Sequence, residues 1–197
     1  MSDELSKEVP ILNKQSMGIS EGLPLNASEG GIDELRKNIQ HMMDMEAIKQ
    51  LKHAYFRCLD TANMEELATL CHPDLSVHYT GGDYEIKLDN RDEFVRTMTQ
   101  SFSSEGVGRH NGYMPEIQML SENEATGIWY LYDHYWALNN KHLTHGTALY
   151  WDRYLKLDGH WVIKTTKYQR IYQINENLQE NPEMVSHYLA THGAKSV

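Results

Sequence analysis

The second half of the chain contains three long segments that are rich in aromatic and β-branched residues. They span Ala125–Leu138, His145–Leu157 and His160–Tyr172. Residues of these types favour extended strands, and the short connections at Asn139–Lys141 and Asp158–Gly159 are typical of hairpin turns. The segments therefore predict three long strands, each antiparallel to the next, and the fold must be built around the sheet that they form.

The first half of the chain shows helical spacing instead. Residues Ile32–Leu59 carry apolar side chains three and four positions apart, which predicts a long helix, whole or in two pieces. Its apolar residues are Leu35, Ile39, Met42, Met43, Ile48 and Leu51. Shorter helices are expected at Met64–Leu70 and at Arg91–Ser101, where Asn90 or Asp89 is a suitable N-terminal cap.

The segments next to these helices have other patterns. Residues Leu75–Thr80 alternate apolar with polar side chains, as a half-buried strand does. Gly81–Asp83 is expected to turn the chain, and Tyr84–Leu88 to return it. Glu105–Asn111 is rich in glycine and is interpreted as a connection, after which Met114–Leu120 begins a sheet.

Helices that precede a strongly curved sheet are typical of an α+β fold. We expect a cone-shaped, curved antiparallel sheet that wraps around the long N-terminal helix and has one open end, a shape that suits a small apolar ligand. This domain would span residues 32–174. Residues 1–31 are polar and would form a flexible arm, or a strap over a neighbouring subunit, and residues 175–197 a tail with a short helix near Pro182–Thr191.

Charge and hydropathy exclude several classes of partner. The net charge is −10 and Lys and Arg form no block, so the positive surface of a protein that binds nucleic acid or anionic membranes is missing. No segment approaches the roughly 20 apolar residues of a membrane span, and no secretory signal is visible. We therefore expect a cytoplasmic protein. Its two cysteines, Cys58 and Cys71, are expected to be free thiols because they lack CxxC spacing.

Five polar residues are expected to face the core or its open end. Tyr55 lies in the apolar stripe of the long helix, and Asp60 joins that face if the helix ends or bends just before it. Tyr79 shares the inward face of its strand. The glycine-rich connection delivers His110, and Asp133 alternates in step with the large apolar residues of the first long strand.

Together these residues are suited to proton transfer. Histidine moves protons near neutral pH, and does so better when a carboxylate fixes its tautomer, so Asp60 or Asp133 could serve His110. Phenols in a dry pocket, here Tyr55 and Tyr79, can stabilise negative charge on a substrate oxygen. Burial that raises the pKa of Asp133 would instead let it protonate a leaving group.

Each of these residues also has a structural interpretation. A tyrosine in a helical stripe is commonly part of the core, an aspartate at a helix end is commonly a cap, and Asp133 could face solvent. The chain has 11 histidines, most of which should be surface residues; His145 is a weaker catalytic candidate, and it flanks a hairpin with His142 where both would be solvated. Because no histidines have metal-ligand spacing and no GxSxG, GxGxxG or P-loop motif occurs, we expect neither a metal nor a cofactor.

Several segments, taken together, are similar to one known superfamily. They are EAIKQLKHAYFRCLD at Glu46–Asp60, RHNGYMPEI at Arg109–Ile117, ATGIWYLYD at Ala125–Asp133 and DGHW at Asp158–Trp161. In this order they resemble the cone-shaped α+β barrel superfamily that includes nuclear transport factor 2, scytalone dehydratase and the SnoaL-like polyketide cyclases. The resemblance covers about Ile39–Tyr172, and within the superfamily it is strongest to the bile acid 7α-dehydratases.

This resemblance implies a function. The residues that match the superfamily's tyrosine, aspartate and histidine positions are Tyr55, Asp60, Tyr79, His110 and Asp133. In related dehydratases and dehydrochlorinases an aspartate and histidine pair removes a proton from carbon while a group leaves the neighbouring carbon. The resemblance therefore implies a cofactor-independent lyase, a dehydratase that acts on a steroid-like or other polycyclic, apolar hydroxy-carbonyl compound, with His110 as the general base.

Other interpretations stay open because one fold hosts many activities. A polyketide cyclase or a double-bond isomerase would use the same residues. A non-catalytic binding module, such as the small subunit of a ring-hydroxylating dioxygenase, would need them only to satisfy one another. We also expect a homo-oligomer, a dimer or trimer in which copies pack sheet to sheet, since the long strands carry aromatic residues on both faces.

Overall fold

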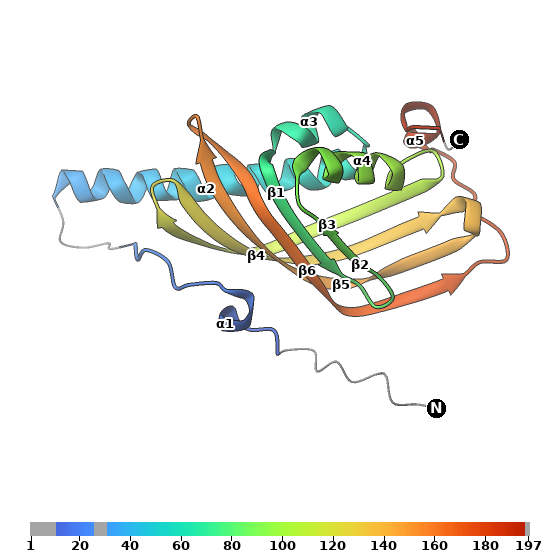
Figure 1. The fold of residues 1–197 in the computed structure, drawn as a ribbon, viewed down its shortest axis with the longest axis horizontal. Coiled ribbons are helices and arrows are strands. Elements are labelled where there is room, and N and C mark those ends of the chain that lie inside the picture. Colours follow the sequence, from blue (N-terminus) through green and yellow to red (C-terminus); the bar gives the residue numbers. More distant parts are fainter. Residues whose placement is uncertain (1–10, 26–30, 196–197) are drawn as a thin grey trace.

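Six strands form one curved sheet, and the long helix and two shorter helices lie along one face of it (Figure 1). This computed structural model describes residues 11–25 and 31–195. The described helices are α1 (Lys14–Met17), α2 (Ile32–Asp60), α3 (Met64–Thr69), α4 (Arg91–Ser101), the 3₁₀ helix η1 (Leu138–Asn140) and α5 (Tyr188–His192). The described strands are β1 (Cys71–Thr80), β2 (Glu85–Leu88), β3 (Gly106–Ser121), β4 (Glu124–Ala137), β5 (His142–Leu157) and β6 (His160–Asn177).

The order of strands across the sheet is β2-β1-β6-β5-β4-β3. The pairs β1–β2, β3–β4, β4–β5 and β5–β6 are antiparallel, as hairpins require. Strand β1 runs parallel to β6, with Val77 opposite Thr166 and Tyr79 opposite Tyr168. The expected α+β fold with a curved sheet is confirmed, and this one pairing departs from a wholly antiparallel arrangement. The physical reason is that no hairpin joins β1 to β6, so the connection does not dictate their relative direction.

The glycine-rich segment before His110 is part of strand β3 and not a connection, which corrects the prediction. Glycines on either side of His110 are needed because neighbouring side chains lie very close to the β3 backbone. A Cβ on Gly112 would lie 1.9 Å from the ring of Phe56 on α2, and a Cβ on Gly108 would lie 2.5 Å from the ring of Phe102. Gly112 therefore lets β3 pass close to α2, and Gly108 lets it pass close to Phe102 at the end of α4, with His110 between them in the strand.

Helix α2 is a single helix of 29 residues that ends at Asp60. Its buried residues begin only at Asp44, and the later part of the helix packs against β3 and β6. The earlier part extends beyond the sheet in Figure 1. The apolar residues there are 47–61% exposed: Ile32, Leu35, Ile39, Met42 and Met43. The helical periodicity predicted the helix correctly, but only the C-terminal part of α2 packs into the core.

Local signals account for the ends of several elements. Asn90, one of the two expected caps, accepts a hydrogen bond from the backbone N–H of Glu93 at 2.8 Å and begins α4. Asp158 and Gly159 have φ angles of 50° and 82°, as the predicted tight hairpin between β5 and β6 requires. Both cysteines are free, as expected, and both are buried; burial raises the pKa of Cys58 to about 11 and that of Cys71 to about 12.

The described part of the arm lies along the protein's own sheet. The backbone N–H of Leu23 donates to the carbonyl of Met119 on β3 at 2.6 Å, and Ile19 is 8% exposed. In the tail, the helix near Pro182–Thr191 is shorter than predicted, since α5 begins only at Tyr188. None of the described helices is long and apolar enough to cross a membrane.

Candidate active site

A cavity of about 310 Å³ lies between the end of α2, helix α4 and the six strands. Aromatic and aliphatic side chains form most of its lining, so a bound ligand would be largely removed from water. Four of the five predicted site residues line it: Tyr55, Tyr79, His110 and Asp133. The fifth, Asp60, lines an adjoining groove that also reaches His110. The structure thus brings the whole predicted set to one place.

Asp60 holds His110 by two hydrogen bonds. One carboxylate oxygen accepts from the backbone N–H of His110 at 3.0 Å, and the other lies 2.6 Å from its Nδ1. Helix α2 ends at Asp60, so the carboxylate can turn toward the strand that carries the histidine. Because the carboxylate of Asp60 accepts a hydrogen bond from Nδ1–H, the unprotonated nitrogen of a neutral imidazole is Nε2, which is the atom available as a base.

Aromatic rings fix the plane of the imidazole. The ring of Phe56 stacks on His110 at 6.0 Å between centroids, and the ring of Phe102 meets it edge-on at 5.5 Å. These contacts leave the His110 side chain only 10% exposed. A histidine held by a carboxylate and two rings keeps one orientation toward the cavity, which is what a general base requires.

Two phenols form the floor of the cavity. The hydroxyls of Tyr55, on α2, and Tyr79, on β1, lie 2.6 Å apart, and both rings are buried. Burial raises the pKa of Tyr55 and of Tyr79 well above the ordinary phenol range, so both remain protonated at neutral pH. Within such a pair one hydroxyl donates to the other, and the remaining proton is available to an oxygen in the cavity.

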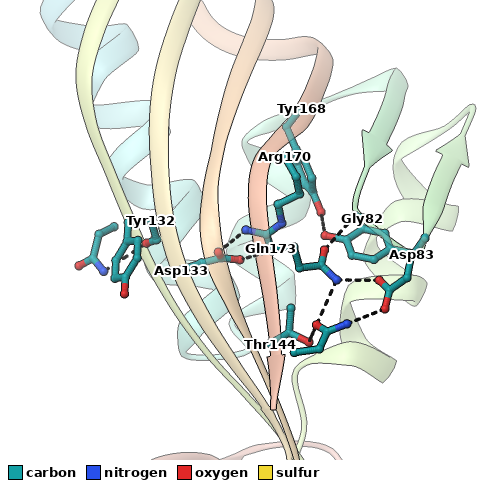
Figure 2. Close-up of polar contacts among 11 residues, drawn as sticks. Gly82, Asp83, Tyr132, Asp133, Thr144, Tyr168, Arg170 and Gln173 are labelled. Atoms are coloured by element: carbon teal, nitrogen blue, oxygen red, sulfur yellow. Dashed lines mark hydrogen bonds and ion pairs between the residues drawn. The ribbon is translucent and has the colours of Figure 1, made fainter. Parts of the chain in front are cut away.

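Asp133 does not hold His110, although the two residues are directly opposite on β4 and β3. Both its carboxylate oxygens accept hydrogen bonds from the guanidinium of Arg170 on β6, the Nη2 bond measuring 2.8 Å (Figure 2). Burial opposes the charge on Arg170, but the bonds and attraction of Asp133 outweigh it and raise the pKa of the guanidinium. Of the two expected partners, Asp60 alone orients the histidine.

Sequence reasoning missed Arg170 as a member of this site. A signal was present, since Arg170 comes two residues after Tyr168 and so shares its face on the last long strand. A mid-strand carboxylate that faces the core also needs a cation. The sequence does not give the strand register. That register places Arg170 on β6 beside Asp133 on β4, with β5 between the two strands.

Polar side chains connect the turn between β1 and β2 to the end of β6 (Figure 2). Asp83, in the turn between β1 and β2, accepts hydrogen bonds from the amides of Gln173 and Asn175 at 2.7 and 2.8 Å. The same turn leads to Tyr84, whose hydroxyl bonds with that of Tyr168 inside the cavity. The extension of β6 beyond its predicted end therefore anchors one wall of the cavity.

The two hairpin histidines differ from their prediction as solvated residues. His142 lines the cavity and hydrogen-bonds with Asn177 at 3.1 Å. His145 does not line the cavity; its side chain is 18% exposed, stacks on His134 at 5.2 Å between centroids and bonds with Glu176 at 3.0 Å. This position removes His145 from the candidate set. Among the residues that the structure describes, no cluster of three or more histidine, cysteine or acidic side chains could hold a metal.

A second buried polar cluster lies on α2, next to the cavity floor. Lys52 and Asp152 form an ion pair at 2.8 Å, and neither side chain has any exposed surface. Asp152 also accepts from the hydroxyl of Tyr154 at 2.7 Å, and Tyr154 accepts from the indole of Trp129 at 2.9 Å. Neither Lys52 nor Asp152 lines the cavity. Sequence reasoning missed this pair because lysine in a helix normally marks a solvated face.

The geometry combines a histidine oriented by a carboxylate with two phenol hydroxyls at a mostly apolar cavity. Comparison with known proteins identifies the fold family. The profile of the SnoaL-like domain family matches residues 40–167. The chain belongs to the SnoaL-like domain family. This confirms the resemblance at family level.

Solved structures with the same fold extend this SnoaL-like assignment. A putative scytalone dehydratase from Novosphingobium aromaticivorans has a TM-score of 0.63 at 21% identity, covering 75% of this chain and 98% of that chain. A hexachlorocyclohexane dehydrochlorinase, LinA type 2, has a TM-score of 0.64 at 14% identity, covering 75% and 99%. An NTF2-like protein with a cystatin-like fold from N. aromaticivorans has a TM-score of 0.57 at 12% identity, covering 73% and 92%. At these identities the likenesses establish the fold alone.

Proposed function

We propose that this SnoaL-like protein is a cofactor-independent lyase, a dehydratase that acts on a steroid-like or other polycyclic, apolar hydroxy-carbonyl compound. The observation that carries the proposal is the pair of Asp60 and His110, bonded at 2.6 Å beside a mostly apolar cavity. The names of a scytalone dehydratase and a dehydrochlorinase among proteins of the same fold favour elimination over other reactions.

In the first step, Nε2 of His110 takes a proton from the carbon next to the substrate carbonyl. Asp60 keeps the other ring proton on Nδ1 and stabilises the imidazolium that forms. The electron pair of the broken C–H bond moves toward the carbonyl, whose oxygen becomes negative. Burial of the site strengthens each of these electrostatic contacts.

The phenol pair stabilises that oxygen. A hydrogen bond from Tyr55 or Tyr79 grows stronger as charge develops, which lowers the barrier more than it tightens substrate binding. The ion pair of Asp133 and Arg170 also lines the cavity, and its two opposite charges offset each other. A pocket lined in this way favours a neutral carbonyl compound over a carboxylate.

In the second step, the electron pair returns to form the carbon–carbon double bond and the hydroxyl group leaves. The imidazolium of His110 gives back its proton to the departing oxygen, so water is released and the histidine is neutral again. The same residue acts as base and then as acid, and no cofactor is required for the balance.

The test is a paired assay of the wild type and His110→Ala on a panel of 7-hydroxylated 3-oxo-steroids and smaller hydroxy-ketones. New conjugation is followed by ultraviolet absorbance, and folding by circular dichroism. We expect the wild-type signal to fall by about 10²–10⁴-fold in the variant. A folded His110→Ala protein with wild-type activity would refute the mechanism.

Product mass separates the remaining candidates. A dehydratase product is lighter by one water, whereas a double-bond isomerase or a cyclase that only rearranges its substrate leaves the mass unchanged. A non-catalytic subunit converts no member of the panel and should bind a partner chain instead. We propose further that the protein is a homo-oligomer, a dimer or trimer, and sedimentation of the purified chain tests this independently of activity.

A further inference from the structure

The buried ion pair of Lys52 and Asp152 has no role in the reaction as proposed above. Both side chains have no exposed surface and lie 2.8 Å apart, and neither lines the cavity. Removing two charges from water is costly, and apolar residues of similar volume often stabilise a core as well as a buried ion pair does. Packing alone therefore gives little reason for a lysine at this position.

The position of the ammonium group suggests what it does. Its Nζ lies 3.9 Å from the ring centre of Tyr150, 4.4 Å from that of Tyr55 and 5.1 Å from that of Phe56. Tyr55 and Tyr150 both line the cavity, whereas Lys52 does not. The cation thus contacts the faces of rings that border the cavity, but it does not line the cavity and cannot itself touch a ligand.

We infer that Lys52 is a positioning residue that strengthens the hydrogen bonds given by the phenol floor to an oxygen that becomes negative in the cavity. The inference rests on the proposed function, in which this oxygen belongs to the substrate carbonyl. A cation against a ring face withdraws electron density from the ring and makes its hydroxyl a stronger donor. The contact of 2.6 Å between the hydroxyls passes this polarisation from Tyr55 to Tyr79.

The surroundings of Lys52 maintain its charge. Burial lowers the pKa of the ammonium, and the adjacent carboxylate of Asp152 opposes that shift. Asp152 is itself held by Tyr154 at 2.7 Å on the side chain oxygen that also meets Lys52. Three aromatic faces add further stabilisation of the cation. The cluster therefore keeps a buried ion pair next to the reaction site, and its ammonium is the charge that contacts the ring faces of Tyr55 and Tyr150.

The experiment uses 4-nitrophenol, an apolar phenol whose ionised form absorbs visible light, as a probe for the oxygen site. The pH at which the bound probe ionises is measured in the full-length wild type and in Lys52→Met/Asp152→Asn. This double variant removes both charges, and the asparagine oxygen still accepts from Tyr154. The matched control is Lys49→Met/Glu46→Gln, which removes an exposed ion pair one turn earlier on the same helix.

We expect the bound probe to ionise about one pH unit higher in the double variant than in the wild type and the control, because the loss of the cation weakens the bonds to the phenolate. Tyr79→Phe should abolish preferential binding of the ionised probe. An equal ionisation pH in all three proteins would overturn the role of Lys52 and leave the lyase proposal intact. A wild type that does not favour the ionised probe over the neutral one would overturn the inference as well, whereas the lyase proposal is tested separately by the His110→Ala assay.

A second variant covers the case in which the double variant does not fold. Lys52→Gln removes the cation but keeps an amide donor for Asp152, and it should shift ionisation of the probe in the same direction. Circular dichroism distinguishes a folded variant from an unfolded one. If folded Lys52→Gln ionises the probe at the wild-type pH, the inference is wrong.

Discussion

Two of the polar clusters on helix α2 differ in what they contact. Asp60, at its end, is 28% exposed in its side chain and holds a histidine that borders the cavity. Lys52, two turns earlier, is fully buried with Asp152 and has no access to the cavity. The first cluster has an unused nitrogen that faces a space for substrate, whereas the second is enclosed by protein. Only the first can exchange protons with a ligand, whereas the second can act on the cavity only through the rings that Lys52 contacts.

The largest effect on activity that tests this difference is expected from Asp60→Asn. The asparagine oxygen still accepts from the backbone of His110, but its amide donates to Nδ1 and places the imidazole proton on Nε2, where it blocks the base. We expect kcat/KM to fall by about 10²–10⁴-fold with little loss of stability. The control is Asp33→Asn, an exposed carboxylate at the start of α2. Wild-type activity in folded Asp60→Asn would contradict the assignment.

The second prediction concerns the enclosed cluster, where stability should suffer first. Lys52→Met leaves the carboxylate of Asp152 buried without its cation, which should lower the free energy of unfolding by roughly 3–5 kcal/mol. Adding Asp152→Asn should restore most of the loss. Urea unfolding measures both, with Lys49→Met as the exposed control. If Lys52→Met were as stable as the wild type, the two clusters would not differ in the way described.

Gly112→Ala tests the role of Phe56, whose ring contacts a residue of each cluster. Phe56 stacks on His110 and also lies 5.1 Å from the ammonium of Lys52, and a Cβ at Gly112 would fall 1.9 Å from its ring. Phe56 must therefore move, at a cost of roughly 1–3 kcal/mol, and both stability and activity should fall. Gly31→Ala is the control, because its Cβ would meet nothing within 4 Å. An unchanged Gly112→Ala protein would show that β3 does not pass as closely under α2 as described.

The smallest effect is expected outside both clusters, at His134. Burial, with contributions from His145 and Arg109, lowers its pKa below 6.5, whereas Asp133 and Glu176 oppose the shift. The unfolded chain then binds this proton more readily than the folded one, so stability present above pH 6.5 is lost as the pH falls.

His134→Gln should therefore lose less stability than the wild type on acidification through pH 6.5, as measured by the midpoint of urea unfolding. His160→Gln, a change at an exposed histidine, is the control. If the wild type and His134→Gln lose stability in parallel, His134 does not contribute to acid sensitivity.

Much of the site could be predicted from periodicity, because periodicity reports which face a side chain takes. Tyr55 in a helical stripe and Tyr79 in an alternating strand both line the cavity, as predicted. The interpretation failed for the glycines of β3, which indicate a loop when local propensity alone is considered. A Cβ on Gly106 would meet the carbonyl of Ser101 and the hydroxyl of Tyr135, and a Cβ on Gly108 the ring of Phe102, so the need for glycine comes from contacts that only the folded chain makes.

The spacing of neighbouring side chains was enough to predict the α+β class, the long helix, the hairpins and the inward faces of Tyr55 and Tyr79, because these features depend on local periodicity. The tertiary structure alone decided the parallel contact of β1 with β6, the choice of Asp60 over Asp133 as the partner of His110, and the pairs of Asp133 with Arg170 and Lys52 with Asp152. These ion pairs join side chains on different strands and helices. Which side chains come into contact depends on strand register and helix position, and both follow from the packing of the whole chain.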